Sequence, residues 1–270
     1  MKRLYCLFII ILYLAISIPS YAQFTINGKH IIYDKQNDTY MACIPEDAFG
    51  KDYEAIILLD IASDWSDLSI DGTQIAYSYT FKQVEGNKLY SIHARKGNKE
   101  INTKITFTFL PLLVLQGSFG YDYAQGSMSL YSPDATEPTI SLIKAKWRGG
   151  STNTADKHKR NYKIKSINFK GKSQDISLLG MREDNNWIMD AGQIDLFRLR
   201  NRIATEIWND FATKPYYASK EPKAKSGVAG KVVEVILNNE YRGIYSLTEA
   251  MDRKELKLKK YDDKNQEFHG

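Results

Sequence analysis

Short alternating segments separated by turn dipeptides fill the first half of the chain and restrict it to antiparallel β structure. The apolar or alternating segments are 55–59, 74–81, 88–93 and 105–115. Asp71-Gly72, Gly86-Asn87 and Gly97-Asn98 stand between them, and such dipeptides favour tight turns. Turns about ten to fifteen residues apart are typical of a sandwich or a small barrel. We therefore predict a β-sandwich-like domain over residues 23–135.

The first 22 residues have the composition of an export signal. Lys2 and Arg3 precede an almost wholly apolar run, and Ser20-Tyr21-Ala22 supplies the small residues that signal peptidase requires. We predict cleavage after Ala22 and a secreted, periplasmic or cell-surface protein. A membrane anchor is the alternative, but about 13 apolar residues fall short of the ~20 that a spanning helix needs. No membrane span is therefore expected after cleavage.

Charge and cysteine content argue against a nucleic-acid-binding protein and against a protein with an intrachain disulfide. The chain carries a formal net charge of +5, and loss of the two basic leader residues lowers it to about +3. This balance does not predict a nucleic-acid partner. Only Cys43 remains after cleavage, so an intrachain disulfide is not expected.

The pattern changes after the turn-rich joint at residues 133–138, which predicts a second domain over 136–270. Its expected elements are strands at 139–147, 161–169 and 187–189, a helix from Asp195 to about Phe211, and a hairpin around Asn238-Asn239. The helix is predicted from apolar residues at spacings of three and four, namely Leu196, Leu199, Ile203, Ile207 and Phe211.

The usual catalytic motifs are absent from the sequence. Gly171-Lys172-Ser173 imitates the end of a P-loop, but Ser166 occupies the position of its first glycine. The chain has no H-E-x-x-H motif and no G-x-S-x-G elbow, and its four histidines are scattered. Hydrolase and metalloprotease functions therefore receive no support.

An acidic cluster of Asp64, Asp67 and Asp71 is a weak candidate for a calcium loop. It lacks the alternating spacing of an EF-hand, so we interpret it as a solvated loop.

One glycine turn carries the remaining chemical signal. Residues 148–153, RGGSTN, are followed by Lys163-Ile164-Lys165 in a predicted strand. Glycines let backbone N–H groups approach phosphate oxygens, and a lysine on the strand can pair with those oxygens. A plain hairpin turn with solvated lysines is the alternative. The two lysine side chains point the same way, so the sequence does not choose between them.

Four blocks of sequence together resemble the spore-coat protein H (CotH) kinase-like family, in the form met in secreted proteins of Bacteroidetes-type bacteria. They are WRGGSTN, KRNYKIKS, LLGMREDNNWIMDAGQIDLFRLRNRIATEIWND and VEVILNNEYRGIYSLTEAMDRKELKLKKYD. The resemblance covers residues 140–261. It implies a secreted atypical protein kinase that uses ATP and a divalent metal, Mg²⁺ or Mn²⁺, to phosphorylate proteins outside the cytoplasm.

The resemblance also implies roles for individual residues. The nucleotide would lie under the loop formed by Arg148, Gly149, Gly150, Ser151, Thr152 and Asn153. Lys163 or Lys165, with Lys165 preferred, would bind its phosphates. Glu249 would lie beside the adenine, with a surface glutamate as the alternative, and Glu206 would be a possible partner of the lysine. Trp187 and Asp190 are expected to pack and cap the helix, and Arg200-Asn201 to structure the lobe.

The implied fold class is α+β, with the β-sandwich-like domain followed by a partial kinase-like lobe of one antiparallel sheet and one main helix. Family members continue into a carboxyl lobe that carries the metal-binding aspartates, so we expect a truncated member that is inactive alone, with no catalytic or metal-binding residue in this chain. The alternative is a non-catalytic surface or binding protein that uses the sandwich. The protein substrate or surface partner stays unnamed.

Overall fold

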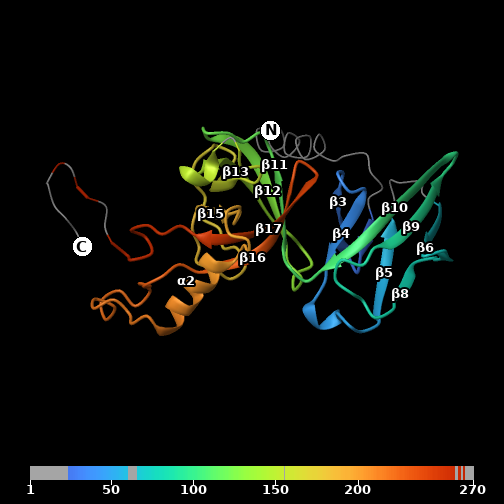
Figure 1. Cartoon of the computed structure of the whole chain (residues 1–270), viewed down its shortest axis with the longest axis horizontal. Helices are drawn as coiled ribbons and strands as arrows, with labels where there is room; N and C mark the ends of the chain where they lie inside the picture. The colour runs from blue at the N-terminus through green and yellow to red at the C-terminus, as the bar shows by residue number, and fades with distance from the viewer. Residues whose placement is uncertain (1–23, 60–65, 155, 259–260, 263, 265–270) are drawn as a thin grey trace, which may run out of the picture.

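The computed structural model describes residues 24–59, 66–154, 156–258, 261, 262 and 264. The predicted signal peptide and Asp64 lie outside the described residues. The described chain is mostly β structure and forms two units, a pair of sheets and a closed barrel (Figure 1). No helix in the described part of the chain is long and apolar enough to cross a membrane.

The amino-terminal unit is built from two sheets that share one apolar core. The four-stranded sheet has the order β2 (Lys29–His30), β1 (Phe24–Ile26), β5 (Tyr53–Leu59) and β8 (Ser78–Phe81). The six-stranded sheet has the order β3 (Ile32–Asp34), β4 (Thr39–Cys43), β10 (Lys99–Thr108), β9 (Tyr90–Lys96), β6 (Ser66–Ile70) and β7 (Thr73–Gln74). A 3₁₀ turn, η1 (Glu46–Ala48), follows β4. Phe81 of one sheet and Phe107 of the other pack edge to face at 4.7 Å between ring centroids, so the sheets are held together through aromatic side chains.

The second unit is a closed barrel of seven strands. Around the barrel they are β11 (Leu112–Gln116), β12 (Ala124–Tyr131), β13 (Thr139–Arg148), β14 (Asn161–Ile167), β15 (Asn186–Asp190), β17 (Glu240–Glu249) and β16 (Gly230–Leu237). Neighbouring strands are antiparallel except β11 and β16, whose parallel pairing closes the barrel. Alternate side chains fill the interior, among them Met128, Ile143 and the fully buried Trp187.

The predicted fold class, α+β with a kinase-like lobe, is wrong. The strands of the expected antiparallel sheet belong to a closed barrel, and only one α-helix is found among the described residues. Closure requires β11 and β12, which precede the predicted joint at 133–138 and were assigned to the sandwich. β10 ends at Thr108, and Pro111 lies in the bend before β11, so the single predicted segment 105–115 is two strands in different units.

A small apolar cluster joins the two units. Met41 and Cys43 of β4 pack against Leu112 of β11 and Ile236 of β16. Burial raises the pKa of the Cys43 thiol to about 12, so this cysteine is unreactive. The β3–β4 turn also bonds to the barrel, since the backbone N–H of Lys35 donates to the carbonyl of Asn239 at 2.7 Å. The units therefore meet through both apolar packing and backbone hydrogen bonds.

The helix α2 (Arg200–Phe211) begins five residues later than predicted. Arg198 has a φ of +62°, which interrupts the expected first turn, although Asp195 still accepts the N–H of Arg200 at 2.9 Å. The predicted apolar face is not buried, because Ile203 and Phe211 are 52% and 65% exposed. The helix instead buries Arg202, whose guanidinium lies where a side chain at Gly230 would be.

Candidate functional site

The glycine turn predicted to face phosphates joins β13 to β14. Gly149 has a φ of +103°, and a Cβ atom there would lie 2.2 Å from the hydroxyl of Thr152, so only glycine fits without strain. The short helix η2 (Ser151–Asn153) completes the turn, and Asn153 is buried. No hydrogen bond from the Gly149 or Gly150 amides is found in the described part of the chain, so both N–H groups are available to a ligand.

Lys163 and Lys165 lie on the outer face of the barrel. Tyr162 and Ile164 alternate with them and point into the barrel core. Across the hairpin, Lys163 pairs in register with Lys146, and Lys165 pairs with Lys144. Four half-buried lysines therefore form two directly opposed pairs on adjacent strands, and we call them the lysine face.

The lysine face has no counter-charge within the described residues, where none of its four ammonium groups forms an ion pair. Two of these ammonium groups lie over the aromatic ring of Tyr123. The Nζ atom of Lys165 is 4.8 Å and that of Lys146 is 5.1 Å from the ring centroid. Like charges directly opposite one another destabilise a sheet. The arrangement is therefore suited to binding a multiply charged anion, which would relieve this repulsion.

Sequence reasoning missed Lys144, Lys146 and Tyr123. The signal was present, because KAK precedes the glycine turn and KIK follows it at matching distances along the hairpin. In a hairpin of known register, both lysine pairs must share one face.

Glu249 lies on the opposite side of the barrel wall from the lysine face. It ends β17 on the same side as the core residues Tyr245 and Leu247, and it is 1% exposed. One carboxylate oxygen accepts the N–H of Arg182 at 2.8 Å, and the other accepts the N–H of Ala229 at 2.9 Å. Both oxygens are thus occupied, so Glu249 and the two predicted lysines are not brought together in one site.

The buried carboxylates of Glu249, Asp184 and Glu255 pair with three cations, and we call the six residues the buried ionic cluster. The cations are Arg182, Lys225 and Lys254. Arg182 lies 2.6 Å from Glu255 and 2.9 Å from Asp184, and Lys254 lies 2.7 Å from Asp184. Lys225 approaches Glu249 at 3.4 Å. The cluster fastens the loop before β15 and the segment after β17 to the same end of the barrel.

Burial acts on two acids of this cluster, Glu255 and Asp184, but their pKa values move in opposite directions. Burial and the neighbouring charge of Glu249 raise the pKa of Glu255 against the effect of Arg182. For Asp184, burial also acts upward, but hydrogen bonds from Lys254 and from the N–H of Asn185 bring its pKa below the ordinary value. The cluster therefore depends on its cations to keep these carboxylates charged.

Residues 145–269 match the family model described as CotH kinase protein. This segment belongs to the CotH family. No curated protein matches the chain. The CotH segment contains the glycine turn, three of the four lysines of the lysine face, α2 and the buried ionic cluster, whereas Lys144 lies one residue before it.

The remaining predicted residues of the CotH segment have structural contacts. Glu206 pairs with Arg202 on its own helix at 3.3 Å and is not an ion-pair partner of Lys163 or Lys165 among the described residues. Trp187 packs in the barrel core. Asp190 accepts from the side-chain amide of Asn201 at 3.3 Å, which ties α2 to β15.

The described residues can be compared with the ATP and the divalent metal that the resemblance implies. The unpaired lysine face offers four cations to a triphosphate. In the described ranges no group of three or more His, Cys, Asp or Glu side chains is arranged to hold a metal ion. The divalent metal implied by the resemblance therefore has no fitting site in this part of the chain.

Lys159 provides a test of the electrostatics near the glycine turn. Its ammonium donates to the carbonyl of Ile244 and lies 4.2 Å from the ring centroid of Tyr245. Burial, assisted by the charge of Arg198, lowers the pKa of Lys159 from 10.5 to about 8. We expect heteronuclear NMR of the lysine Nζ to show this residue titrating near pH 8, well before exposed lysines.

The lowered pKa of Lys159 also predicts how the free energy of unfolding changes with pH. Between pH 8 and 10.5 the unfolded chain holds a proton that folded Lys159 has lost, so the free energy of unfolding should gain a favourable contribution as pH rises across this window. Lys159→Met should remove that contribution, as measured by urea unfolding at both ends of the window. An identical pH dependence in the variant would contradict the assignment.

Proposed function

We propose that the CotH segment binds the phosphates of ATP on its lysine face and serves protein phosphorylation outside the cytoplasm. The observation that carries the proposal is the set of two opposed lysine pairs beside the glycine turn, whose ammonium groups form no ion pair with any described residue. Membership of the CotH kinase family supports a kinase-related function. The apolar leader supports export of the protein.

The chemistry of such a function is phosphoryl transfer. The hydroxyl oxygen of a protein side chain forms a bond to the γ-phosphorus of ATP, the bond from that phosphorus to the bridging oxygen breaks, and ADP and a proton leave. The role of the chain described here is to bind and orient the phosphates. Lysine ammonium groups and free backbone N–H groups both stabilise phosphate charge.

The test is titration of a fluorescent ATP analogue into the chain at increasing ionic strength. We expect saturable binding that tripolyphosphate competes away and that weakens between about 0.05 and 0.5 M salt, because half-exposed charges are screened beyond a Debye length of ~10 Å at 0.1 M. Inorganic phosphate should compete poorly. Absence of saturable binding at millimolar ligand would contradict the proposal.

A further inference from the structure

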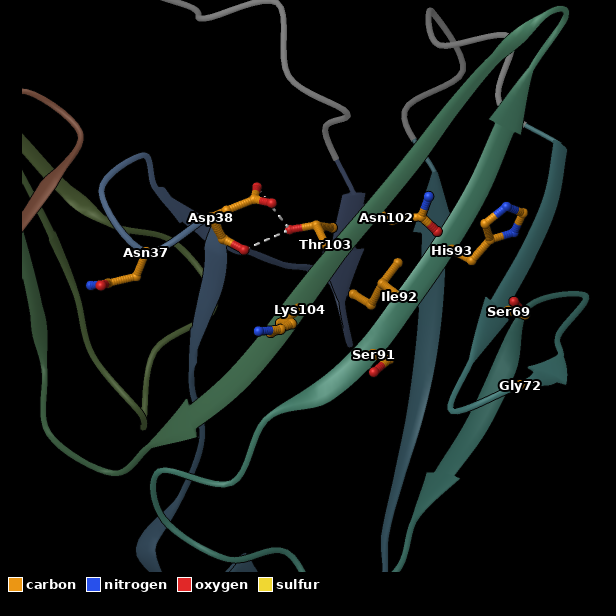
Figure 2. Close-up of a pocket in the computed structure, with 10 residues that line it drawn as sticks. All are labelled: Asn37, Asp38, Ser69, Gly72, Ser91, Ile92, His93, Asn102, Thr103 and Lys104. Carbon is orange, nitrogen blue, oxygen red and sulfur yellow. Dashed lines mark hydrogen bonds between the residues drawn. The ribbon is translucent and has the colours of Figure 1, made fainter.

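A trough crosses the outer face of the six-stranded sheet in the amino-terminal unit (Figure 2). Its volume is about 500 Å³. The turn containing Asn37 and Asp38 forms one end, and Ser69 and Gly72 form the other. The trough therefore runs across the strands, from the end of β3 over β10 and β9 to the β6–β7 turn. Three strand spacings of ~4.8 Å give it a length of about 14 Å.

The floor of the trough is made of two cross-strand pairs. Ser91 of β9 pairs in register with Lys104 of β10, and His93 pairs with Asn102. These side chains point away from the core because Tyr90, Ile92 and Ala94 alternate with those of β9 and belong to the core. In the described part of the chain, the side chains of Ser91, Asn102 and Lys104 make no hydrogen bond to protein. Their donors and acceptors are free.

The trough has little net charge. The carboxylate of Asp38 already accepts hydrogen bonds from Tyr33 at 2.8 Å and, more weakly, from Thr103 at 3.4 Å. His93 lies 3.9 Å from Glu100 across the hairpin. Lys104 is thus a single cation among hydroxyl and amide groups, in contrast to the four cations of the lysine face. A highly charged ligand is not favoured here.

A second cavity of about 380 Å³ adjoins the trough along β10 and reaches Asp34 and the barrel residues Glu234 and Tyr241. Asn37 and Lys104 line both cavities, so the two adjoin. Thr106 lines the second cavity, and its hydroxyl is buried without a hydrogen-bond partner among the described residues. A buried hydroxyl left unpaired costs free energy, so a ligand group that bonds to it would be stabilising.

We propose that this trough binds a neutral oligosaccharide. Sugar hydroxyls donate and accept at close spacing, as the mixed free groups of Ser91, Asn102 and Thr106 require. An extended peptide would instead add to a sheet edge through its backbone, whereas this trough crosses the strands on the sheet face. The length of the trough exceeds that of a single sugar ring, so an oligomer is the fitting ligand. The assignment is independent of nucleotide binding by the barrel.

The test is calorimetric titration of the full chain with neutral hexasaccharides, namely those of maltose, cellulose, xylan, mannan and laminarin. At least one should bind saturably, and Ser91→Ala/Asn102→Ala should weaken it about tenfold, since two hydrogen bonds are lost. Lys163→Ala/Lys165→Ala, on the barrel, is the matched control and should leave sugar binding unchanged. The trough variant should keep the wild-type melting temperature, and the control variant should be at least as stable as wild type.

Failure of this proposal is distinguishable from failure of ATP binding. If none of the five sugars binds at millimolar concentration, or if the trough variant binds as tightly as wild type, the proposal is overturned. Preferential binding of dextran sulfate over neutral dextran, lost in the trough variant, would also overturn it in favour of an anionic ligand. None of these outcomes depends on the lysine face.

Discussion

Replacing Arg182 by methionine should lower the free energy of unfolding by about 3–5 kcal/mol. Arg182 lies 2.6 Å from Glu255, which is 1% exposed, and 2.9 Å from Asp184, which is 2% exposed. Methionine fills much of the same space but leaves two buried carboxylates short of a cation. Urea unfolding followed by tryptophan fluorescence, to which the fully buried Trp187 contributes, measures the effect.

The free energy of unfolding that Arg182→Met removes should be smaller at acid pH. A carboxyl whose pKa is raised in the folded state costs no stability below its ordinary value, 4.5 for Glu255, and costs more as pH rises through the folded value. Removing Arg182 raises the folded value further, so the cost should be larger at pH 8 than at pH 5. Adding Glu255→Gln should recover at least ~1 kcal/mol, because the two residues interact directly. Arg253→Met, at an exposed neighbour, is the control, and an equal loss there would contradict the argument.

The lysine face should show the largest functional effect. We expect Lys163→Ala/Lys165→Ala to weaken binding of the ATP analogue at least ~100-fold, since each charge-assisted contact contributes about 1.5 kcal/mol or more. Lys144→Ala/Lys146→Ala should weaken it as well, because these residues complete the opposed pairs. Lys231→Ala, an exposed lysine on β16 of the same barrel, should change the dissociation constant less than about twofold.

The melting temperatures of the lysine-face variants distinguish a loss of ligand contacts from misfolding. Removing like charges that face one another across a hairpin should leave the melting temperature unchanged or slightly raised. Weaker binding by a lysine-face variant that is at least as stable as wild type would therefore assign these lysines to a ligand. Equal weakening by all three variants would instead indicate a general effect of net charge.

Local patterns predicted most individual strands and turns. The turns at Asp71-Gly72 and Gly97-Asn98 and the hairpin at Asn238-Asn239 are confirmed, and both asparagines of the hairpin have positive φ. The hairpin of β13 and β14 was expected at its observed place. These features depend on neighbouring residues, whose conformational preferences are written in the sequence.

The closed barrel could not be predicted in the same way. In the sequence, β11 resembles a continuation of β10, and no local pattern indicates that it pairs with β16. Likewise, the apolar periodicity that predicted α2 does not mark its contact with the barrel, because the helix packs through Arg202 against Gly230. Long-range pairing and close approach to a glycine depend on the assembled fold rather than on a local pattern.

The sequence predicted some residues of the candidate site and missed others. Lys163, Lys165 and the glycine turn were found from their residue types, whereas Lys144 and Lys146 required the hairpin register. Glu249 was singled out for a role beside a nucleotide and instead accepts backbone N–H groups. A sequence does not distinguish a buried structural carboxylate from a ligand-binding one, because the two differ only in the groups that the fold places around them.

The parallel pairing of β11 with β16 also governs how the protein folds. Leu112 pairs with Glu234 across roughly 120 residues of sequence, so closing this loop costs conformational entropy before the contacts form. Proteins with such distant pairings fold slowly, and their unpaired strand edges stay exposed meanwhile. During synthesis, β11 must wait until β16 has emerged. The first strand of the barrel is therefore the one most in need of protection from aggregation while the chain is being made.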